Sequence, residues 1–198
     1  MTEVLRPIVM AAGGTGGHVF PAQALAMELR GRGYRLVLVA DRRSEAFDGA
    51  LGELEIHRID AAGVSGKGQL AKGAAIVRLA RGYFQARRLL KRLKPAVVVG
   101  FGSYPSAPTV LAAQHIGGKT VIHEQNAVLG RANRMLARRA TRIATAFHTV
   151  RALRAADRDK TVWIGNPVRP EVIAARDHPY TPPSATGDVN LLVVGGSQ

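Results

Sequence analysis

Short runs of apolar, mostly β-branched residues alternate with longer stretches of helical spacing along this chain. The apolar run at 7–12, a helical pattern over 18–32 and a second apolar run at 35–40 predict a β-α-β unit. Further strands are predicted at 55–59, 96–100, 119–124, 142–147 and 161–165, with helical segments between most of them. Near-continuous apolar strands separated by helices are typical of a parallel sheet covered on both faces. The pattern therefore predicts an α/β fold, a Rossmann-like, doubly wound parallel sheet.

The composition changes towards the end of the chain. Residues 176–188, RDHPYTPPSATGD, are rich in Pro, Ser, Thr and Gly, as linkers are. The following VNLLVVGGSQ begins another apolar run and the loop after it. We therefore expect an N-terminal domain at 1–165, a linker at 166–188 and, at 189–198, the first strand and loop of a truncated second domain.

The overall composition is that of a globular protein, with 46% hydrophobic and 21% charged residues. Cysteine is absent, which excludes disulfides and thiolate metal sites and fits a reducing compartment. No apolar run approaches the roughly 18 residues of a membrane-spanning helix, and the N-terminal segment lacks the long apolar core of a secretory signal. We therefore expect a packed domain that does not cross a membrane.

Basic residues dominate the charge, with 28 Lys and Arg against 14 Asp and Glu, a formal net charge of +14. The excess is concentrated at 61–156, where 17 Lys or Arg accompany a single acid, Glu124. Such a region attracts nucleic acid, an anionic membrane surface or a phosphorylated substrate, and charge alone does not decide among these.

A glycine loop, GGTGGH at 13–18, follows the first predicted strand and opens the first helix. Free backbone N–H groups at a helix N-terminus favour a phosphate or pyrophosphate. The plain alternative is a tight turn, which rarely needs four glycines. The dinucleotide fingerprint is a closer competitor, because Asp41 ends the second strand, but its third glycine would fall where Val19 stands.

Two more polar loops follow predicted strands at the same edge of the sheet. GFGSYPSAP, at 100–108, combines glycines with hydroxyl groups that can bond sugar or phosphate oxygens. HEQN, at 123–126, places four polar side chains at the end of an apolar strand, where burying Glu124 without partners would be costly. His123 alone would be an ordinary core histidine. The zincin motif is absent, because Ala127 replaces its second histidine, and we expect no metal site.

Taken together, these motifs resemble, in order, those of the bacterial peptidoglycan N-acetylglucosaminyltransferases. The likeness covers nearly the whole chain and departs at Ser103 and Ala107, where glycine is common in that family. It implies transfer of N-acetylglucosamine from UDP-N-acetylglucosamine to undecaprenyl-pyrophosphoryl-N-acetylmuramoyl-pentapeptide, which converts lipid I into lipid II. The matching segments are GGTGGHVFPA (13–22), GFGSYPSAP (100–108), HEQN (123–126), GNPVR (165–169) and GGSQ (195–198).

The resemblance also implies an architecture and a set of site residues. The chain would be the N-terminal, acceptor-binding domain of a two-domain GT-B glycosyltransferase, inactive without the second domain and needing no cofactor. His18 would be the catalytic base of an inverting transfer, because an imidazole can accept a proton near neutral pH; its alternative role is only to bind substrate. Donor-binding residues would be Thr15, Gly16, Gly17, Asn126, Arg169, Ser197 and Gln198. Acceptor-binding residues would be Gly13, Gly14, His18, Gly102, Ser103, Tyr104 and Glu124.

A basic helical stretch at 67–94 carries nine Lys or Arg and no acid. Ile76, Leu79, Tyr83 and Phe84 recur there at near-helical spacing, the mixture expected of a surface that lies on an anionic bilayer. The alternative is an ordinary amphipathic helix, and we expect the leucines at 89, 90 and 93 to pack in the core. The resemblance places the enzyme peripherally on the cytoplasmic face of the cell membrane, with cell-wall synthesis and division proteins as partners.

Two other classes remain open from the sequence alone. A nucleic-acid-binding α/β protein would explain the charge, but aromatic residues are only 5% of the chain and no recognisable RNA or DNA module is present. A nicotinamide-dependent dehydrogenase would explain the first β-α-β unit, although the glycine spacing argues against it.

Overall fold

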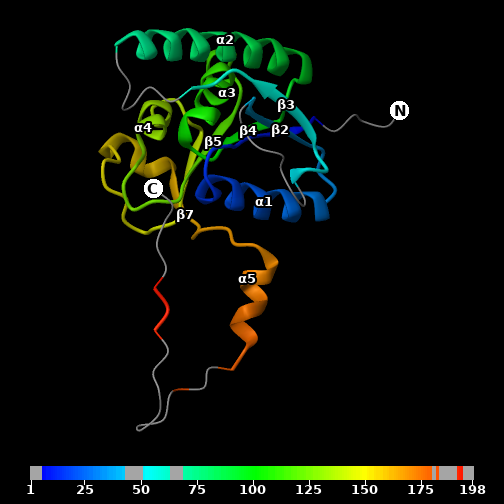
Figure 1. Ribbon diagram of the computed structural model, residues 1–198, viewed down its shortest axis with the longest axis vertical. Helices are drawn as coiled ribbons and strands as arrows, with labels where there is room; N and C mark the ends of the chain where they lie inside the picture. The colour runs from blue at the N-terminus through cyan, green and yellow to red at the C-terminus, as the bar shows by residue number, and fades with distance from the viewer. Residues whose placement is uncertain (1–5, 43–50, 63–68, 180–181, 183–190, 194–198) are drawn as a thin grey trace.

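A seven-stranded sheet forms the centre of the molecule, with helices on both faces (Figure 1). The computed structural model describes residues 6–42, 51–62, 69–179, 182 and 191–193. The strand order is β3-β2-β1-β4-β5-β6-β7, and every neighbouring pair is parallel. The strands are β1 Ile8–Ala11, β2 Leu36–Asp41, β3 Glu55–Ile59, β4 Val97–Gly100, β5 Thr120–Glu124, β6 Arg142–Thr145 and β7 Thr161–Trp163.

This strand order confirms the predicted doubly wound sheet, since it is the Rossmann order with a seventh strand added at one edge. From β1 the chain adds β2 and β3 towards one edge of the sheet, and from β4 it adds β5, β6 and β7 towards the other edge. The switch in direction therefore lies between β1 and β4. The last two strands are shorter than predicted, ending at Thr145 and Trp163. Gly165 adopts a φ of 77°, a left-handed conformation that a strand cannot contain, and this accounts for the early end of β7.

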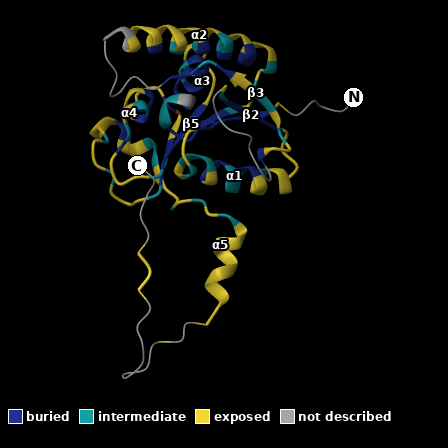
Figure 2. Cartoon of the chain, in the orientation of Figure 1, coloured by how far each residue is buried: buried dark blue, intermediate teal, exposed yellow. Residues whose placement is uncertain are grey.

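Helices α1 and α2 lie on opposite faces of the sheet, and α3 and α4 share the face of α2 (Figure 1). Figure 2 shows the buried strands between them and the exposed outer faces of α1 and α2. The helices are α1 Gly16–Gly31, α2 Gln69–Leu93, α3 Ser103–His115, α4 Arg131–Ala137 and α5 Pro170–Ala174, with 3-10 turns η2 Ala155–Lys160 and η3 Ala175–Asp177.

Two apolar layers hold the sheet between the helices. On the α1 face, Met10 and Leu38 of the central strands pack with Phe101, and all three are almost fully buried. On the other face, Leu89 and Leu90 of α2 are buried against β-strand side chains and against α3 and α4. Leu93 packs at the edge of the same layer, as expected from the sequence. Burying a leucine in this way contributes about 2 kcal/mol.

The segment after β7 leaves the body of the domain and leads to α5, whose residues are all exposed (Figures 1 and 2). Of the strand predicted within 189–198, only residues 191–193 are described; they carry no regular secondary structure and are exposed. The remaining residues of that prediction lie outside the described ones.

Candidate active site

The carboxyl ends of β1 and β4 meet where the strand order reverses. The amide of Phe101 donates to the carbonyl of Ala11 at 3.1 Å, so the loops that follow the two strands leave the sheet side by side. Gly14 has a φ of 88°, and a Cβ added there would lie 3.2 Å from the Ser103 hydroxyl oxygen. Two of the polar loops predicted from the sequence therefore touch at the place where doubly wound sheets bind ligands.

The first loop places unobstructed amides at the start of α1. Gly13 is buried after β1, and Thr15 caps the helix with its backbone. The amides of Gly16 and Gly17 belong to the first helical turn, where no intrahelical carbonyl can reach them, at the positive end of the helix dipole. A Cβ on Gly16 would lie 2.7 Å from the ring of Phe20, so a side chain there would have to displace that partly exposed ring. The free amides at this helix N-terminus suit a phosphate group.

The ring of His18 is held in one tautomer by the second loop. Its Nδ1 lies 2.8 Å from the carbonyl oxygen of Phe101. Because a carbonyl only accepts hydrogen bonds, Nδ1 carries the proton of the neutral ring and Nε2 carries a lone pair. The side-chain amide of Gln125 also contacts Nδ1. With Nδ1 as donor, the amide oxygen of Gln125 is the group that faces it.

The second loop depends on two left-handed residues. Gly102 has a φ of 81° and Ser103 a φ of 63°. A Cβ on Gly102 would lie 3.5 Å from the ring of His18, so glycine lets the backbone approach the imidazole closely. At Ser103 this left-handed conformation costs a non-glycine residue about 1 to 2 kcal/mol. The hydroxyl of Ser106 donates to the carbonyl of Gly102 at 2.6 Å and fixes the turn.

Glu124, at the end of β5, is buried and accepts four hydrogen bonds. Its Oε1 accepts from the backbone amide and the side-chain amide of Asn126, at 3.1 and 2.9 Å. Its Oε2 accepts from the amide of Gly130 at 2.8 Å and from the side chain of Asn133 at 2.9 Å. These bonds compensate the cost of burying the charge. Glu124 therefore holds the loop between β5 and α4 in place, and Asn126 with it.

His123, the preceding residue, is a core side chain. It is buried, and its ring centroid lies 5.8 Å from that of Phe101. Burial lowers the pKa of His123, so the ring is neutral at pH 7. The core interpretation of this histidine is confirmed.

These loops enclose a cavity of about 290 Å³ beside His18. Most of the predicted acceptor residues meet there, together with one predicted donor residue, Asn126. The helix α4 completes the wall with residues that the sequence did not indicate. The lining residues are His18, Gly102, Ser103, Tyr104, Glu124, Asn126, Gly130, Arg131, Ala132 and Asn133.

The guanidinium of Arg169 lies over the ring of Phe20, 4.1 Å from its centroid, a cation–π contact. Phe20 belongs to the first turns of α1, so the GNPVR segment returns to the first glycine loop. Thr15, Gly16, Gly17 and Arg169 are therefore brought near one another. The other two predicted donor residues, Ser197 and Gln198, lie outside the described residues.

Sequence reasoning missed Gln125 and Asn133, which orient the residues that it found. Gln125 lies inside the HEQN motif but was assigned no role, although it contacts His18. Asn133 bridges the carbonyl of His123 and the carboxylate of Glu124, at 3.0 and 2.9 Å. Asn133 is a polar residue on the buried side of α4. The sequence alone does not show which side of this short helix is buried.

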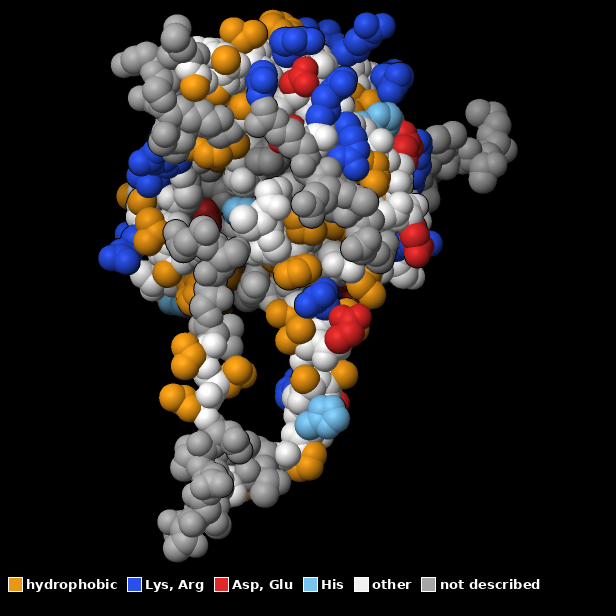
Figure 3. Space-filling view, in the orientation of Figure 1, with side chains coloured by type: hydrophobic (Ala, Val, Ile, Leu, Met, Phe, Trp, Pro, Cys, Tyr) orange, Lys and Arg blue, Asp and Glu red, His pale blue; other side chains and the backbone are white. Residues whose placement is uncertain are grey.

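Of the residues predicted to form a membrane surface on α2, some are exposed and others pack against the domain. Ile76 and Phe84 are 59% and 66% exposed, and Leu79 is half-buried. Tyr83 instead packs against the core, and its hydroxyl lies 2.9 Å from Nδ1 of His115. Figure 3 shows Lys and Arg side chains gathered around α2. None of the described helices is long and apolar enough to cross a bilayer.

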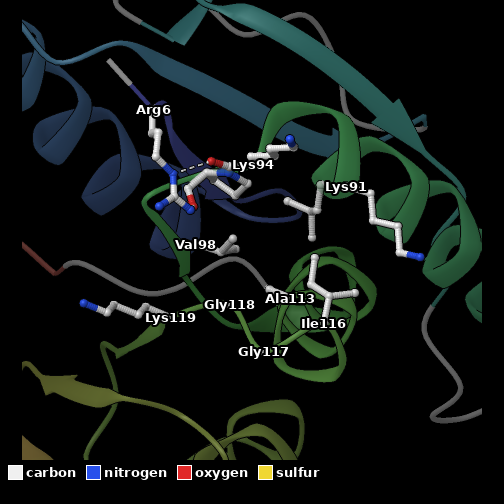
Figure 4. Close-up of a pocket in the computed structure, with 11 residues that line it drawn as sticks. Arg6, Lys91, Lys94, Val98, Ala113, Ile116, Gly117, Gly118 and Lys119 are labelled. Atoms are coloured by element: carbon white, nitrogen blue, oxygen red, sulfur yellow. Dashed lines mark hydrogen bonds between the residues drawn. The ribbon is translucent and has the colours of Figure 1, made fainter. Parts of the chain in front are cut away.

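A larger cavity, of about 640 Å³, lies at the opposite edge of the sheet, near the start of β4 and the ends of α2 and α3 (Figure 4). Lys91 and Lys119 lie on opposite sides of it, with Val98 and Ile116 between them. None of the predicted site residues lines it. Among the described residues, no group of three His, Cys, Asp or Glu side chains could hold a metal ion.

Comparison with known protein families agrees with this site. The family model described as "Glycosyltransferase family 28 N-terminal domain" matches residues 8–145, from β1 to the end of β6. The chain belongs to glycosyltransferase family 28. The match includes both glycine loops, His18 and the end of β5, so the family 28 domain contains the cavity described above.

Relatives of this family 28 chain carry the name that its motifs indicate. The UDP-N-acetylglucosamine--N-acetylmuramyl-(pentapeptide) pyrophosphoryl-undecaprenol N-acetylglucosamine transferase of Rhodospirillum centenum is 56% identical over 98% of this chain and 51% of its own length. The enzyme of the same name from Methylobacterium sp. is 54% identical over 100% of this chain and 53% of its own length. The resemblance is thus confirmed, and the chain spans about half the length of these curated relatives.

Solved structures agree with the family 28 fold. The crystal structure of Acinetobacter baumannii MurG matches with a TM-score of 0.68 and 32% identity, over 90% of this chain and 50% of that one. A UDP-N-acetylglucosamine 2-epimerase from Rickettsia bellii matches with a TM-score of 0.59 and 14% identity, over 86% of this chain and 47% of that one. The second likeness concerns the fold alone. None of these proteins is named as a nucleic-acid-binding protein or a dehydrogenase.

Proposed function

We propose that this chain is the acceptor-binding half of an inverting glycosyltransferase. The enzyme would transfer N-acetylglucosamine from UDP-N-acetylglucosamine to undecaprenyl-pyrophosphoryl-N-acetylmuramoyl-pentapeptide, the reaction in the names of the relatives at 54 and 56% identity. In this proposal residues 1–165 form the acceptor domain, 166–188 the linker and 189–198 the start of the donor domain. The enzyme would work peripherally at the cytoplasmic face of the membrane, beside proteins of cell-wall synthesis and division.

The observation that carries the proposal is the fixed tautomer of His18. Its Nδ1 proton is committed to the carbonyl of Phe101, so Nε2 is the proton acceptor in a ring that lines the cavity. In the transfer, the acceptor hydroxyl oxygen forms a bond to the anomeric carbon of the donor while the bond from that carbon to the phosphate oxygen breaks. The hydroxyl proton passes to Nε2, and UDP leaves with the bonding electrons.

The charge that develops on the leaving UDP needs stabilisation. The amides of Gly16 and Gly17 and the guanidinium of Arg169 are the groups of this chain suited to that role, because they gather at the start of α1. Arg169 is permanently charged and its fork matches phosphate oxygens. Thr15 and Asn126, with Ser197 and Gln198, complete the proposed donor contacts. The proposed acceptor contacts, besides His18, are Gly13, Gly14, Gly102, Ser103, Tyr104 and Glu124.

Radiolabelled UDP-N-acetylglucosamine and a lipid I analogue test the proposal. The full-length enzyme, meaning a chain of the relatives' length that contains these 198 residues, should form the disaccharide product. Residues 1–198 alone should form none, because they would supply only one wall of the donor pocket. Product from the short chain would contradict the division of labour between domains, and no product from the full-length enzyme would overturn the function.

A further inference from the structure

A second groove lies two strands away from β5, which borders the His18 cavity; it runs along β7, from Arg158 before the strand to Trp163 at its end, beside the carboxyl end of β6. It has a volume of about 510 Å³. Its floor includes Val150 and Leu153, which pack on the core, and its walls and rim include His148, Arg158 and Trp163. We call it the β7 groove. None of these side chains has a role in the site described above.

Trp163 stands in the β7 groove as a fixed, exposed aromatic surface. The residue is 60% exposed, which leaves a large apolar area in water. The indole Nε1 donates to the carbonyl of Ala146 at 3.2 Å, and the ring of His148 meets it edge-on, with centroids 5.4 Å apart. Because the ring is already held in one orientation, a ligand that packs on it loses little side-chain conformational entropy, which favours binding.

The rim of the β7 groove is positively charged. Arg158 is exposed, and within the described part of the chain its guanidinium has no carboxylate partner. The neighbouring acid, Asp157, is buried and already engaged by Arg154 at 2.7 Å and by Lys160 at 2.9 Å. Arg158 is therefore available to a carboxylate of a ligand, as a bidentate partner.

The β7 groove lies within reach of an acceptor bound beside His18. Adjacent strands are about 4.8 Å apart, so β7 is roughly 14 Å from β4 along the sheet. A five-residue peptide in extended form spans up to about 17 Å. A peptide attached to a sugar in the His18 cavity can therefore cross the ends of β5 and β6 and end beside Trp163.

We propose that the β7 groove binds the peptide of the acceptor. Trp163 packs against apolar parts of the peptide, Val150 and Leu153 form the floor beneath it, and Arg158 pairs with a peptide carboxylate. This inference rests on the proposed function, because only an acceptor with a peptide would occupy both sites. It makes the residues between β6 and β7 determinants of acceptor specificity.

Steady-state kinetics of the full-length enzyme with two acceptors tests this inference. One acceptor analogue carries the pentapeptide, and the other is the same lipid-linked sugar without it. Trp163→Ala and Arg158→Ala should each raise KM for the peptide-bearing acceptor by about 10-fold. KM for the peptide-free acceptor and for UDP-N-acetylglucosamine should stay within about twofold of wild type. Tyr34→Ala and Arg32→Ala, exposed side chains of similar types that precede β2 and do not line the groove, are the controls.

Each outcome distinguishes a peptide subsite from a donor-side or purely structural role of these residues. An unchanged KM for the peptide-bearing acceptor in both variants would overturn the inference. An equal loss with both acceptors, or a raised donor KM, would also overturn it and would assign Trp163 to a contact with the second domain. If Trp163→Ala fails to fold, as judged by circular dichroism, the exposed Arg158→Ala decides alone. Wild-type enzyme that uses neither acceptor would refute the proposed function itself.

Discussion

His18 joins the two glycine loops, because its ring lies against Gly102 while its backbone belongs to the first turn of α1. Replacing it by alanine in the full-length enzyme should lower kcat by about 100-fold or more, with a smaller effect on KM for UDP-N-acetylglucosamine. His57→Ala, which removes the same side chain at the edge strand β3, is the matched control and should leave kcat unchanged. An unchanged kcat in His18→Ala would show that His18 is not the catalytic base and only binds substrate.

Asp157 predicts a pH dependence of stability. Hydrogen bonds from Arg154 and Lys160 lower the pKa of Asp157 from the ordinary 3.8 to about 2. The folded state therefore favours the ionised carboxylate, which adds stability above about pH 4 that is lost as the pH falls towards about 2. The shift corresponds to about 2 kcal/mol at neutral pH.

Urea unfolding measures this contribution. Asp157→Asn should be less stable than wild type at pH 7, and the gap should narrow as the pH falls from about 5 to about 3. The exposed neighbour Asp159→Asn should track wild type throughout. A gap that stays constant down to about pH 3 would show that the carboxylate does not act through its charge.

Residues of the candidate site could be predicted from the sequence when a neighbouring motif marked them. They could not be predicted when their contacts come from a distant part of the chain. His18, Gly102 and Asn126 lie in or at the end of the loops that follow strands, and parallel strands bring these loops to one edge. Glu124 was found in the same way, but its four hydrogen-bond donors were not, because they come from a turn and from α4. Asn133 was missed for the same reason: its burial depends on how α4 packs against β5.

Among the elements, strand and helix cores were predictable and their ends were not. The helical pattern began at residue 18 because the preceding glycines are typical of a loop, yet α1 begins at Gly16. The packing of α2 could not be predicted from its spacing alone. Some of its apolar side chains, such as Leu90, face the core, and others, such as Phe84, face water.

Two glycines of α2 distinguish packing from helix propensity. A Cβ on Gly82 would lie 1.8 Å from the carbonyl oxygen of Asp60, whereas one on Gly73 would meet nothing within 4 Å. Gly82→Ala should therefore force α2 away from the end of β3 and destabilise the domain by about 2 kcal/mol or more. Gly73→Ala should stabilise it by up to about 1 kcal/mol through helix propensity. Thermal or urea unfolding of both variants tests this, and equal effects would contradict the packing of α2.

At the scale of the whole molecule, the charge of +14 and the exposed face of α2 predict association with an anionic bilayer. Liposomes with anionic lipid should retain residues 1–198, and neutral liposomes much less, because each Lys or Arg near the surface contributes about 1 kcal/mol. Salt should weaken binding, since the Debye length is about 8 Å at physiological ionic strength.

Apolar contact is tested by Ile76→Ser with Phe84→Ser, the two predicted patch residues that are mostly exposed. The double variant should be released from anionic liposomes at low salt while circular dichroism shows an intact fold. Tyr34→Ser with Met135→Ser removes comparable exposed side chains elsewhere and should remain bound. Retention of the first variant would show that binding is purely electrostatic.

Trp163 is the single tryptophan of these 198 residues, and it stands in the β7 groove. The tryptophan fluorescence of these 198 residues therefore reports on the surroundings of Trp163 in the β7 groove. Covering the exposed ring should move its emission to shorter wavelength and protect it from a neutral quencher such as acrylamide. Occupancy of the groove can thus be followed optically, without turnover and without an added label.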